Sequence, residues 1–395
     1  VYPISKIKRK AADGRFASEI KDPEKRKKVL GSYYAVSNYT DVNSKFGSME
    51  DFQNLVNTAH ENGMYVILDW VANHTGWDNV WIKEHPEYYT HNDKGEIIDP
   101  VNPETGKSWG WTDTADLNYD NKDLWAAMTN SMEYWVKQHN VDGFRCDVAA
   151  GVPTEFWNQA VKKINKIHPI FMLAEGDAPD LLKQAFDMGY NWKGLHLMNE
   201  IAQGKATVKA WDKNMKSVDS IYENDDIWMN FITNHDENSW SGTVQERLGD
   251  ASNTMLALTY TIPGMPLIYS GQEYGLDRRL KFFEKDSIPK SKGEVYSLME
   301  KLGKLKNSNK ALDGGKEAAS YTRLTTSEDS KVLAFRREKG GKEVVYIANM
   351  TKDPVKFSLK ATGNYTDYLS NEQMELKEGT EMNFSPWEYK ILVNK

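Results

Sequence analysis

The most constraining feature of this 395-residue sequence is a recurring unit in which an amphipathic helix is followed by a short apolar strand. In the clearest copy, Ser48 and Asp51 form a capping signature, and apolar residues then recur with helical spacing until Gly63. A continuous apolar run over 64–68 follows and stops at Asp69, as expected for a parallel strand covered on both faces. Strands that alternate with helices in this way predict an α/β fold with a parallel sheet.

The same unit recurs further along the chain. A helical pattern over 124–136 leads into a strand ending near Asp147, and a helix that we expect Thr154 to cap leads into a strand over 170–174. Further strands are predicted near 195–198, over 227–233 and over 266–269. No glycine-rich phosphate-binding turn follows a strand, so the pattern favours a (β/α)8 barrel over a doubly wound sheet.

Two stretches interrupt the alternation. Residues 75–121 are polar and rich in turn-forming residues, and a stretch of this length predicts a small subdomain inserted over one mouth of the barrel. From about residue 319, short alternating strands separated by polar turns predict an antiparallel β-sandwich. We therefore predict a barrel domain over 1–318, with a subdomain at about 75–121, and a C-terminal β-sandwich domain over 319–395.

Composition excludes several kinds of partner and covalent link. The net charge is −7, and without a basic face the chain lacks the clustered Lys and Arg that binding to nucleic-acid phosphates requires. No stretch approaches the roughly 18 apolar residues of a transmembrane helix. The single cysteine, Cys146, rules out an intramolecular disulfide.

Acidic residues mark the ends of several predicted strands, at Asp69, Asp147, Glu175 and, in the turn after a strand, Asp236. The carboxyl ends of barrel strands meet at one face, so we expect these side chains to lie together. A single acidic residue at a strand end can equally cap the next helix, but four such residues favour a site. Two neighbouring carboxylates can cleave a glycosidic bond, one as proton donor and the other as nucleophile.

The spacing of two of these carboxylates suits that chemistry. Asp147 and Glu175 are 28 positions apart, the length of one helical crossover between neighbouring strands. Neighbouring strand ends lie at about the separation of 5 to 5.5 Å that retaining glycosidases use. Arg145 precedes Asp147 by two residues, points to the same side of the strand and is expected to keep that carboxylate ionised.

Two histidines, His74 and His235, each follow an asparagine at the exit of a predicted strand. Structural, catalytic and, together with Asp236, metal-binding interpretations are all open for such residues. The metal interpretation ranks low because the sequence has no HExxH helix, no paired cysteines and no acidic cluster with EF-hand spacing.

Six segments carry a combined signal. They are VILDWVANHT at 66–75, TADLN at 114–118, DGFRCDVA at 142–149, MLAEG at 172–176, FITNHDE at 231–237 and GMPLIYSGQE at 264–273. In content and order they resemble the sequence regions of the α-amylase family of glycoside hydrolases. The resemblance is close over roughly 33–275, and the trailing strands are similar to the family's C-terminal domain. It implies a (β/α)8 TIM barrel with a small subdomain after strand 3 and a C-terminal antiparallel β-sandwich.

The resemblance also implies roles for individual residues. It makes Asp147 the nucleophile, Glu175 the general acid and base, and Asp236 the carboxylate that orients the sugar hydroxyls and stabilises the transition state. Tyr34 falls where the family places an aromatic platform under the central sugar, and Asp69 matches a residue near the insertion. The substrate-binding residues implied in this way are Tyr34, Asp69, His74, Arg145 and His235.

In calcium-dependent members of the family, residues equivalent to Asn73 and Asp116 help to hold a calcium ion. Gly151 stands where those members have a histidine four residues after the nucleophile, so a structural calcium ion stays an open alternative. No cofactor is expected to be required for the chemistry. Val148, directly after the nucleophile position, occurs in many relatives that cut α-1,6 bonds, whereas many α-1,4-acting relatives have Thr or Ala there.

The start of the chain departs from the family pattern, because the segment VYPISKI looks like the exit of the family's second strand. A parallel barrel without its first strands would expose strand edges, so we expect the native chain to extend before Val1.

These observations predict a retaining hydrolase of α-1,4-glucosidic bonds in starch or malto-oligosaccharides, acting through a covalent glucosyl-enzyme intermediate. The enzymatic alternatives are an α-1,6-acting glucosidase or neopullulanase-like enzyme, and a transglycosylase. A non-catalytic glucan-binding relative is the alternative from another class, and the three intact carboxylates argue against it. The expected partner is an α-glucan polysaccharide or oligosaccharide, and such a substrate is associated with a secreted, periplasmic or surface location.

Overall fold

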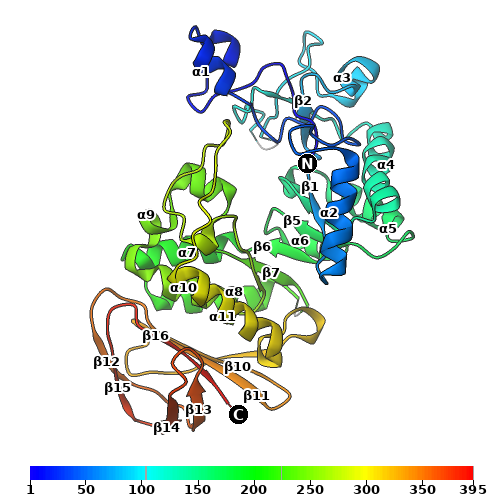
Figure 1. Ribbon diagram of the computed structural model, residues 1–395. Helices are drawn as coiled ribbons and strands as arrows, with labels where there is room; N and C mark the ends of the chain where they lie inside the picture. Colours follow the sequence, from blue (N-terminus) through cyan, green and yellow to red (C-terminus); the bar gives the residue numbers. More distant parts are fainter. Residues whose placement is uncertain (103–104, 224, 395) are drawn as a thin grey trace. The chain divides into compact units, whose positions relative to one another are not determined.

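The computed structural model describes residues 1–102, 105–223 and 225–394, which form two compact units (Figure 1). The first unit comprises Val1–Gly189 and Lys281–Asp286, and the second comprises Tyr190–Leu280 and Ser287–Lys395. Positions 103 and 104 of the predicted insertion, and position 395 of the predicted sandwich, lie outside the described residues. The domain boundary near residue 319 stays a prediction.

A parallel sheet with strand order β1-β4-β5-β6 lies at the centre of the first unit. Its strands are β1 (Ile67–Trp70), β4 (Gly143–Cys146), β5 (Phe171–Ala174) and β6 (Met188–Tyr190). The longer helices of this unit are α2 (Met49–Glu61), α4 (Lys122–His139) and α5 (Thr154–Ile164). Because Ile67 is in register with Gly143, and Gly143 with Phe171, the carboxyl ends of β1, β4 and β5 are level.

Local sequence explains how these elements begin and pack. The predicted capping box of α2 is confirmed, since the Ser48 hydroxyl accepts from the Asp51 backbone N–H and Asp51 accepts in return from that of Ser48. Strand β4 approaches β5 so closely at Gly143 that a Cβ there would lie 1.8 Å from the Phe171 carbonyl oxygen. Glycine at this position therefore allows the two strands to pair.

The segment after β1 contains a small antiparallel pair, β2 (His74–Gly76) and β3 (Thr114–Asp116), with His74 opposite Asp116. The short helices of the first unit are α1 (Pro23–Lys28), α3 (Trp81–Glu84) and α6 (Pro179–Leu182). Buried tyrosines anchor this segment to the backbone that leaves β1, because Tyr39 donates to the Val71 carbonyl and Tyr119 to the Ala72 carbonyl.

The second unit begins with helices and a parallel strand pair. The strands are β7 (Ile227–Asn230) and β8 (Met265–Pro266), with Met229 in register with Met265. The helices are α7 (Trp192–Ala202), α8 (Val208–Ile221), α9 (Val244–Leu248), α10 (Ser252–Thr261) and α11 (Glu294–Ser308).

The C-terminal segment folds as two antiparallel sheets, as the alternating pattern predicted. The larger has the order β14-β13-β16-β11-β10-β9, and the smaller pairs β12 with β15. Their bounds are β9 (Ser320–Arg323), β10 (Val332–Lys339), β11 (Lys342–Asn349), β12 (Val355–Ser358), β13 (Gly363–Asp367), β14 (Gln373–Leu376), β15 (Glu381–Phe384) and β16 (Tyr389–Val393).

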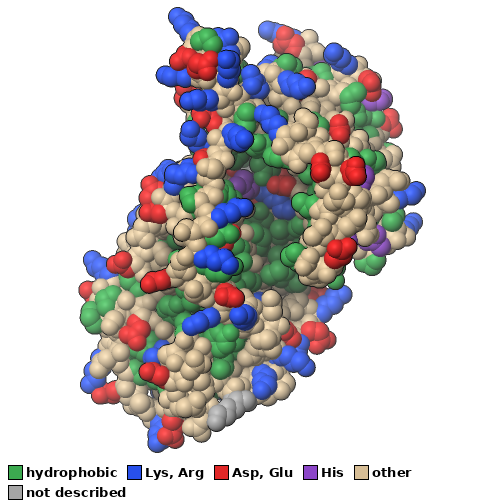
Figure 2. All heavy atoms as spheres, viewed as in Figure 1, with side chains coloured by type: hydrophobic (Ala, Val, Ile, Leu, Met, Phe, Trp, Pro, Cys, Tyr) green, Lys and Arg blue, Asp and Glu red, His purple; other side chains and the backbone are tan. Residues whose placement is uncertain are grey.

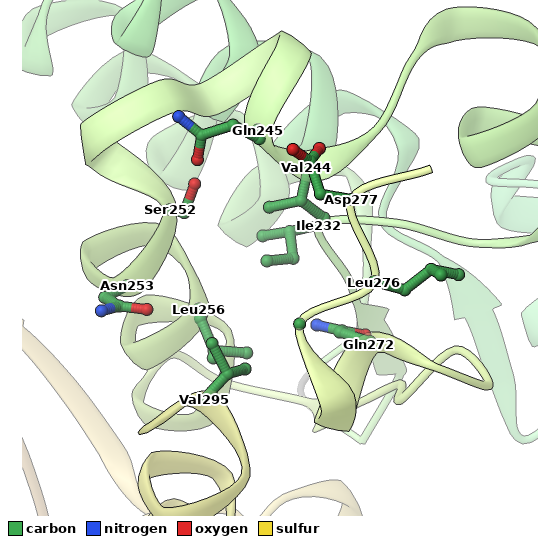
Figure 3. Close-up of a pocket in the computed structure, with 11 residues that line it drawn as sticks. Ile232, Val244, Gln245, Ser252, Asn253, Leu256, Gln272, Leu276, Asp277 and Val295 are labelled. Carbon is green, nitrogen blue, oxygen red and sulfur yellow. The ribbon is translucent and has the colours of Figure 1, made fainter. Parts of the chain in front are cut away.

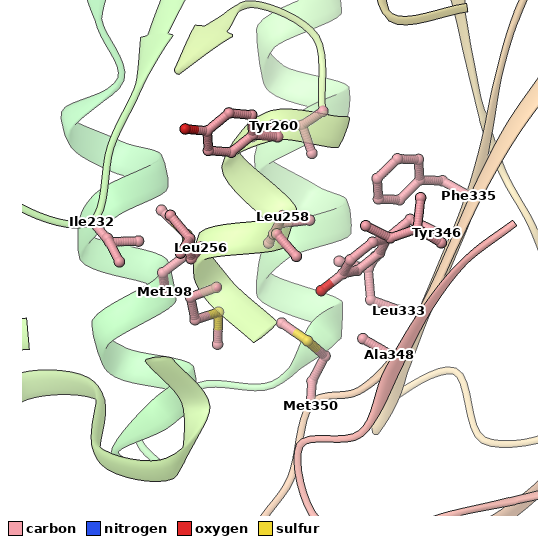
Figure 4. Close-up of a cluster of buried hydrophobic side chains, with 14 of the residues drawn as sticks. Met198, Ile232, Leu256, Leu258, Tyr260, Leu333, Phe335, Tyr346, Ala348 and Met350 are labelled. Atoms are coloured by element: carbon pink, nitrogen blue, oxygen red, sulfur yellow. The ribbon is translucent and has the colours of Figure 1, made fainter. Parts of the chain in front are cut away.

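The centre of the larger sheet is buried on both faces. Leu333 and Phe335 of β10, with Tyr346 of β11, pack against Leu256 and other residues of the helices (Figure 4). The alternate side chains of the same strands pack against the smaller sheet, and these include Val332, Ala334, Val345 and Ile347. One sheet therefore contributes to two hydrophobic cores.

Three details of the predicted elements are wrong. Residues 195–198 belong to helix α7, and the strand lies earlier, at β6. The short apolar run was ambiguous, and the buried Leu195, Met198 and Ile201 recur with helical spacing. Asp69 lies inside β1 instead of after it, because β1 extends to Trp70. Thr154 is the first residue of α5, whose N-cap is Pro153 without a side-chain cap.

Two surface properties bear on partners. Acidic and basic side chains are interspersed over the face in Figure 2. Within the described parts of the chain, none of the helices combines the length and apolar character that crossing a membrane requires.

Candidate active site

Arg145 on β4 is the centre of an ion-pair cluster in the first unit. Its Nη1 lies 2.8 Å from Oδ1 of Asp147 and 2.8 Å from Oδ1 of Asp69, and its Nη2 lies 3.1 Å from Oε1 of Glu175. Hydrogen bonds extend the strand ladder at the sheet edge, from the Asp147 N–H to the Trp70 carbonyl and from the Glu175 N–H to the Cys146 carbonyl. The sheet thus brings three of the predicted site residues onto one guanidinium.

The charges in this cluster do not balance. Burial raises the pKa of Asp147 well above its usual range, and the Glu175 and Asp69 carboxylates act in the same direction. Arg145 lowers this pKa, in the expected direction, but is outweighed, so the net shift is opposite to the one expected from Arg145. Three carboxylates around one cation thus leave the buried charge of Asp147 only partly compensated.

The backbone after β4 fixes Glu175. The Val148 N–H donates to Oε2 of Glu175 at 2.8 Å, and the Ala149 N–H donates to the carbonyl oxygen of the same residue. Val148 has φ of 43°, in the left-handed region that a β-branched residue rarely adopts. Such strain is concentrated at functional sites, and here it directs a backbone donor at a predicted catalytic carboxylate.

Tyr34 forms an aromatic wall of the cluster. Its hydroxyl donates to Oδ2 of Asp69 at 2.8 Å, and its ring lies 5.9 Å from the Arg145 guanidinium carbon. Phe282, far away in sequence, stacks on Tyr34 with ring centroids 6.3 Å apart and planes inclined by 19°. Phe282 was not predicted, and no motif in its surroundings signals this position.

His74 is fully buried beside the cluster's strand ends, and burial lowers its pKa to about 4. Asn73 Nδ2 lies 3.2 Å from His74 Nδ1, and because an amide nitrogen can only donate, this contact places the proton of the neutral ring on Nε2. His74 is therefore neutral at ordinary pH, and its ring also forms a hydrogen bond with the Tyr34 backbone, which raises the pKa but is outweighed by burial.

An aromatic row continues from His74 towards solvent. Trp111 lies 5.7 Å from the His74 ring, and Trp109 stacks on Trp111 at 5.7 Å with planes inclined by 16°. Trp109 is 47 % exposed, an unusual position for a tryptophan. Sequence reasoning passed over this pair, although the SWGW segment within the polar insertion is a local signal for it.

The two predicted calcium ligands lie near one another in the chain's hairpin, since Asn73 precedes β2 and Asp116 ends β3. Burial raises the pKa of Asp116 to about 6, and its Oδ2 accepts from the Thr90 hydroxyl at 2.7 Å. A Cβ at Gly151 would lie 2.7 Å from Oδ1 of Asn73, so a side chain at this position would require the Asn73 side chain to move. Within the described ranges, no three His, Cys, Asp or Glu side chains are grouped as a metal site. A structural calcium ion stays an open alternative.

The second unit holds the remaining predicted site residues. His235 Nε2 lies 3.4 Å from Oδ2 of Asp236, in the turn that follows β7. The Asn234 side chain accepts from the Glu237 backbone N–H at 2.7 Å, which closes the turn around them. Their roles in catalysis and substrate binding stay predictions.

The family description "Alpha amylase, catalytic domain" matches residues 16–323. The maltogenic alpha-amylase of Bacillus acidopullulyticus is 25% identical over 385 residues, covering 91% of this chain and 64% of the relative. The cyclomaltodextrin glucanotransferase of Paenibacillus macerans is also 25% identical, over 389 residues that cover 85% of this chain and 51% of the relative. The chain thus spans about half to two thirds of the length of these curated relatives.

A crystal structure of a noncanonic maltogenic alpha-amylase from Thermotoga neapolitana is similar to all of this chain and to 88% of its own, with a TM-score of 0.85 and 26% identity. The predicted fold class, a (β/α)8 barrel with a C-terminal antiparallel β domain, is thereby confirmed. Over more than half of its length, and through the strands that carry Asp147 and Glu175, the chain belongs to the α-amylase family.

Proposed function

We propose that this protein is a retaining hydrolase of α-1,4-glucosidic bonds in starch or malto-oligosaccharides. The observation that carries the proposal is the pair of carboxylates, Asp147 and Glu175, that contact the two terminal nitrogens of Arg145 at neighbouring strand ends. Two carboxylates held by one guanidinium at neighbouring strand ends are suited to the double displacement of retaining glycosidases.

In the first step, Glu175 donates its proton to the glycosidic oxygen while Asp147 attacks the anomeric carbon. The bond to the leaving sugar breaks, and a covalent glucosyl-Asp147 ester forms. In the second step, Glu175 removes a proton from water, the water oxygen attacks the anomeric carbon, and Asp147 leaves as a carboxylate. Two inversions give a product with the α configuration of the substrate.

Other residues are assigned supporting roles in the proposal. Tyr34, held by its hydrogen bond to Asp69, offers a ring face for the sugar at the cleaved bond. The neutral His74 lies beside Tyr34 at the sugar, and Asp236 and His235 are assigned the binding of sugar hydroxyls. The exposed face of Trp109 supports an extended glucan, since an apolar ring face suits stacking of a further glucose unit.

The decisive experiment replaces Asp147 with Asn and measures starch hydrolysis. We expect a loss of about 10⁴-fold or more, because the nucleophile is removed while the shape of the site is kept. Asp180→Asn is the matched control, since Asp180 is an exposed acidic residue that pairs with Lys183. A D147N variant that keeps most of its activity would refute the assignment, and circular dichroism checks that the variant is folded.

The type of bond cleaved, and the choice between hydrolysis and sugar transfer, need separate assays. Val148 after the nucleophile favours an α-1,6-acting alternative, and a transferase among the relatives favours transglycosylation. Products from starch, pullulan and isomaltose, with their anomeric form followed by NMR, separate these enzymes. Release of the α anomer from starch supports retaining hydrolysis, longer products indicate transfer, and activity on isomaltose indicates the α-1,6 alternative. A wild-type protein that binds starch without cleaving it is a glucan-binding relative.

A further inference from the structure

The second unit contains a half-open cavity of about 230 Å³ that uses none of the predicted catalytic residues. Side chains from α9, α10 and α11, and from the segment after β8, surround it (Figure 3). Its buried wall includes Ile232, Leu256 and Gln272. Its exposed rim includes Gln245, Asn253 and Asp277.

Gln272 is the unusual member of this wall. It is 7% exposed, and its Oε1 accepts from the Tyr269 backbone N–H at 3.1 Å, which fixes the orientation of the amide. The Nε2 group is buried and finds no hydrogen-bond acceptor among the described residues, and Figure 3 shows the amide nitrogen turned towards the cavity. An unsatisfied buried donor costs about 1 to 3 kcal/mol. The arrangement is explained if an oxygen of a bound molecule accepts from this amide.

The lining restricts what that molecule can be. Among the described residues that line the cavity, none is Lys, Arg or His, which argues against phosphates and other anions. Asp277 at the rim accepts from the Thr243 hydroxyl through Oδ1, and Gln245 and Asn253 add amide groups. A molecule that meets a donor at the wall and a carboxylate at the rim must both accept and donate hydrogen bonds, as a hydroxyl does. The aliphatic side chains suit a compact ring with C–H groups.

We propose that this cavity binds one neutral hexose ring, with a ring hydroxyl accepting from Gln272 Nε2 and another donating to Asp277. The choice of a hexose rests on the proposed function, because the products of such an enzyme are built of glucose units. The cavity and the unsatisfied amide are independent of it. The site would make the protein responsive to its own product at residues that take no part in cleavage.

The test titrates glucose into the D147N protein by isothermal calorimetry, with maltose as a second probe, and repeats the titration in three further variants. Gln272→Met keeps the length of the side chain and removes the donor, and Val295→Phe fills the cavity. Gln159→Met is the matched control, because Gln159 is an exposed glutamine whose amide pairs with Glu155 on α5. Binding at the predicted active site is common to all the proteins.

We expect Gln272→Met to weaken one binding component about threefold to tenfold, the value of one hydrogen bond. Val295→Phe should abolish that component, and the control should keep it. Gln272→Met should also leave the melting temperature unchanged or raise it, since it removes an unsatisfied donor. Glucose binding that is equal in all variants would refute the proposed site. A Gln272→Met protein that is less stable but binds glucose as before would refute it as well. Starch hydrolysis by the wild type, assayed separately, tests the proposed function by itself.

Discussion

Replacing Arg145 with Met should destabilise the protein in a strongly pH-dependent way. Methionine keeps the length of the side chain but removes the guanidinium that contacts Asp147, Glu175 and Asp69. Asp147 and Glu175 have side-chain exposures of 10% and 14%, so water can screen little of their charge. Asp69 is 40% exposed and contributes less.

The size of the expected loss in unfolding free energy follows from these contacts. At an effective dielectric constant of about 20, one pair of unit charges about 4 Å apart is worth about 4 kcal/mol. Removal of one partner of a buried pair is expected to cost about 3 to 5 kcal/mol, because the remaining charges stay buried without compensation. We expect the Arg145→Met variant to lose free energy of unfolding in this range at pH 7.5.

The direction of the pH dependence of this stability loss follows from the raised pKa. Without Arg145, the pKa of Asp147 in the folded state is raised further above its unfolded value, which lies near 4. The folded state then binds more protons than the unfolded state, so the penalty is complete above the raised pKa and fades as the pH falls towards 4. The stability difference between variant and wild type should therefore be large at pH 7.5 and small at pH 4.

Urea unfolding at the two pH values, followed by tryptophan fluorescence and by circular dichroism, measures this difference. Coincident curves from the two probes check that one transition is observed. Arg15→Met is the matched control, because Arg15 forms a short ion pair with Asp13 on the surface, and its loss should change nothing measurable. A loss below about 1 kcal/mol at pH 7.5, or a loss that does not vary with pH, would refute the argument from uncompensated charge.

Three further predictions concern other features of the first unit. Trp109→Ala should lower kcat/KM several-fold on starch and long malto-oligosaccharides but not on maltotriose. The control Trp77→Ala should not distinguish long from short substrates, because Lys8 already covers the Trp77 ring. Equal losses on all chain lengths would contradict a remote sugar platform at Trp109. Gly143→Ala should cost about 2 kcal/mol or more of unfolding free energy, since its Cβ would overlap the neighbouring strand, and an unchanged melting temperature would count against that close approach. Treatment with EDTA should leave the rate of starch hydrolysis unchanged. A loss of activity that calcium restores in the wild type, and that EDTA does not cause in an Asp116→Asn variant, would instead establish an ion at Asp116.

The sequence predicted the parts of the structure that depend on local periodicity. Helix α2 begins at the predicted capping box, and β1, β4 and β5 fall within a few residues of their expected positions. The run at 195–198 was assigned to a strand because four apolar residues fit either period, and only packing against other helices distinguishes the two.

The candidate site was predictable where it depends on strand ends and unpredictable where it depends on the tertiary fold. Asp147 and Glu175 were placed together from their spacing, and both contact Arg145. The direction of the pKa shift at Asp147 was missed because burial and two further carboxylates outweigh one arginine, and neither effect can be read from spacing. Phe282 was missed for the same reason, since nothing local brings it to Tyr34.

The two-sided burial of the larger C-terminal sheet limits how this protein can be rearranged by recombination or engineering. Arg337 on β10 is fully buried and donates to backbone carbonyls that include those of Thr261 on α10 and Asp313, while the Tyr346 hydroxyl donates to the Thr254 carbonyl. Helices and sheet are thus joined by polar contacts as well as by a shared core. An exchange of the C-terminal strands for those of a relative must carry the matching helix surface with it. Because α7 and α8 contribute to the same core, a crossover should lie upstream of α7, and a graft made at β9 would inherit two mismatched halves of one interior.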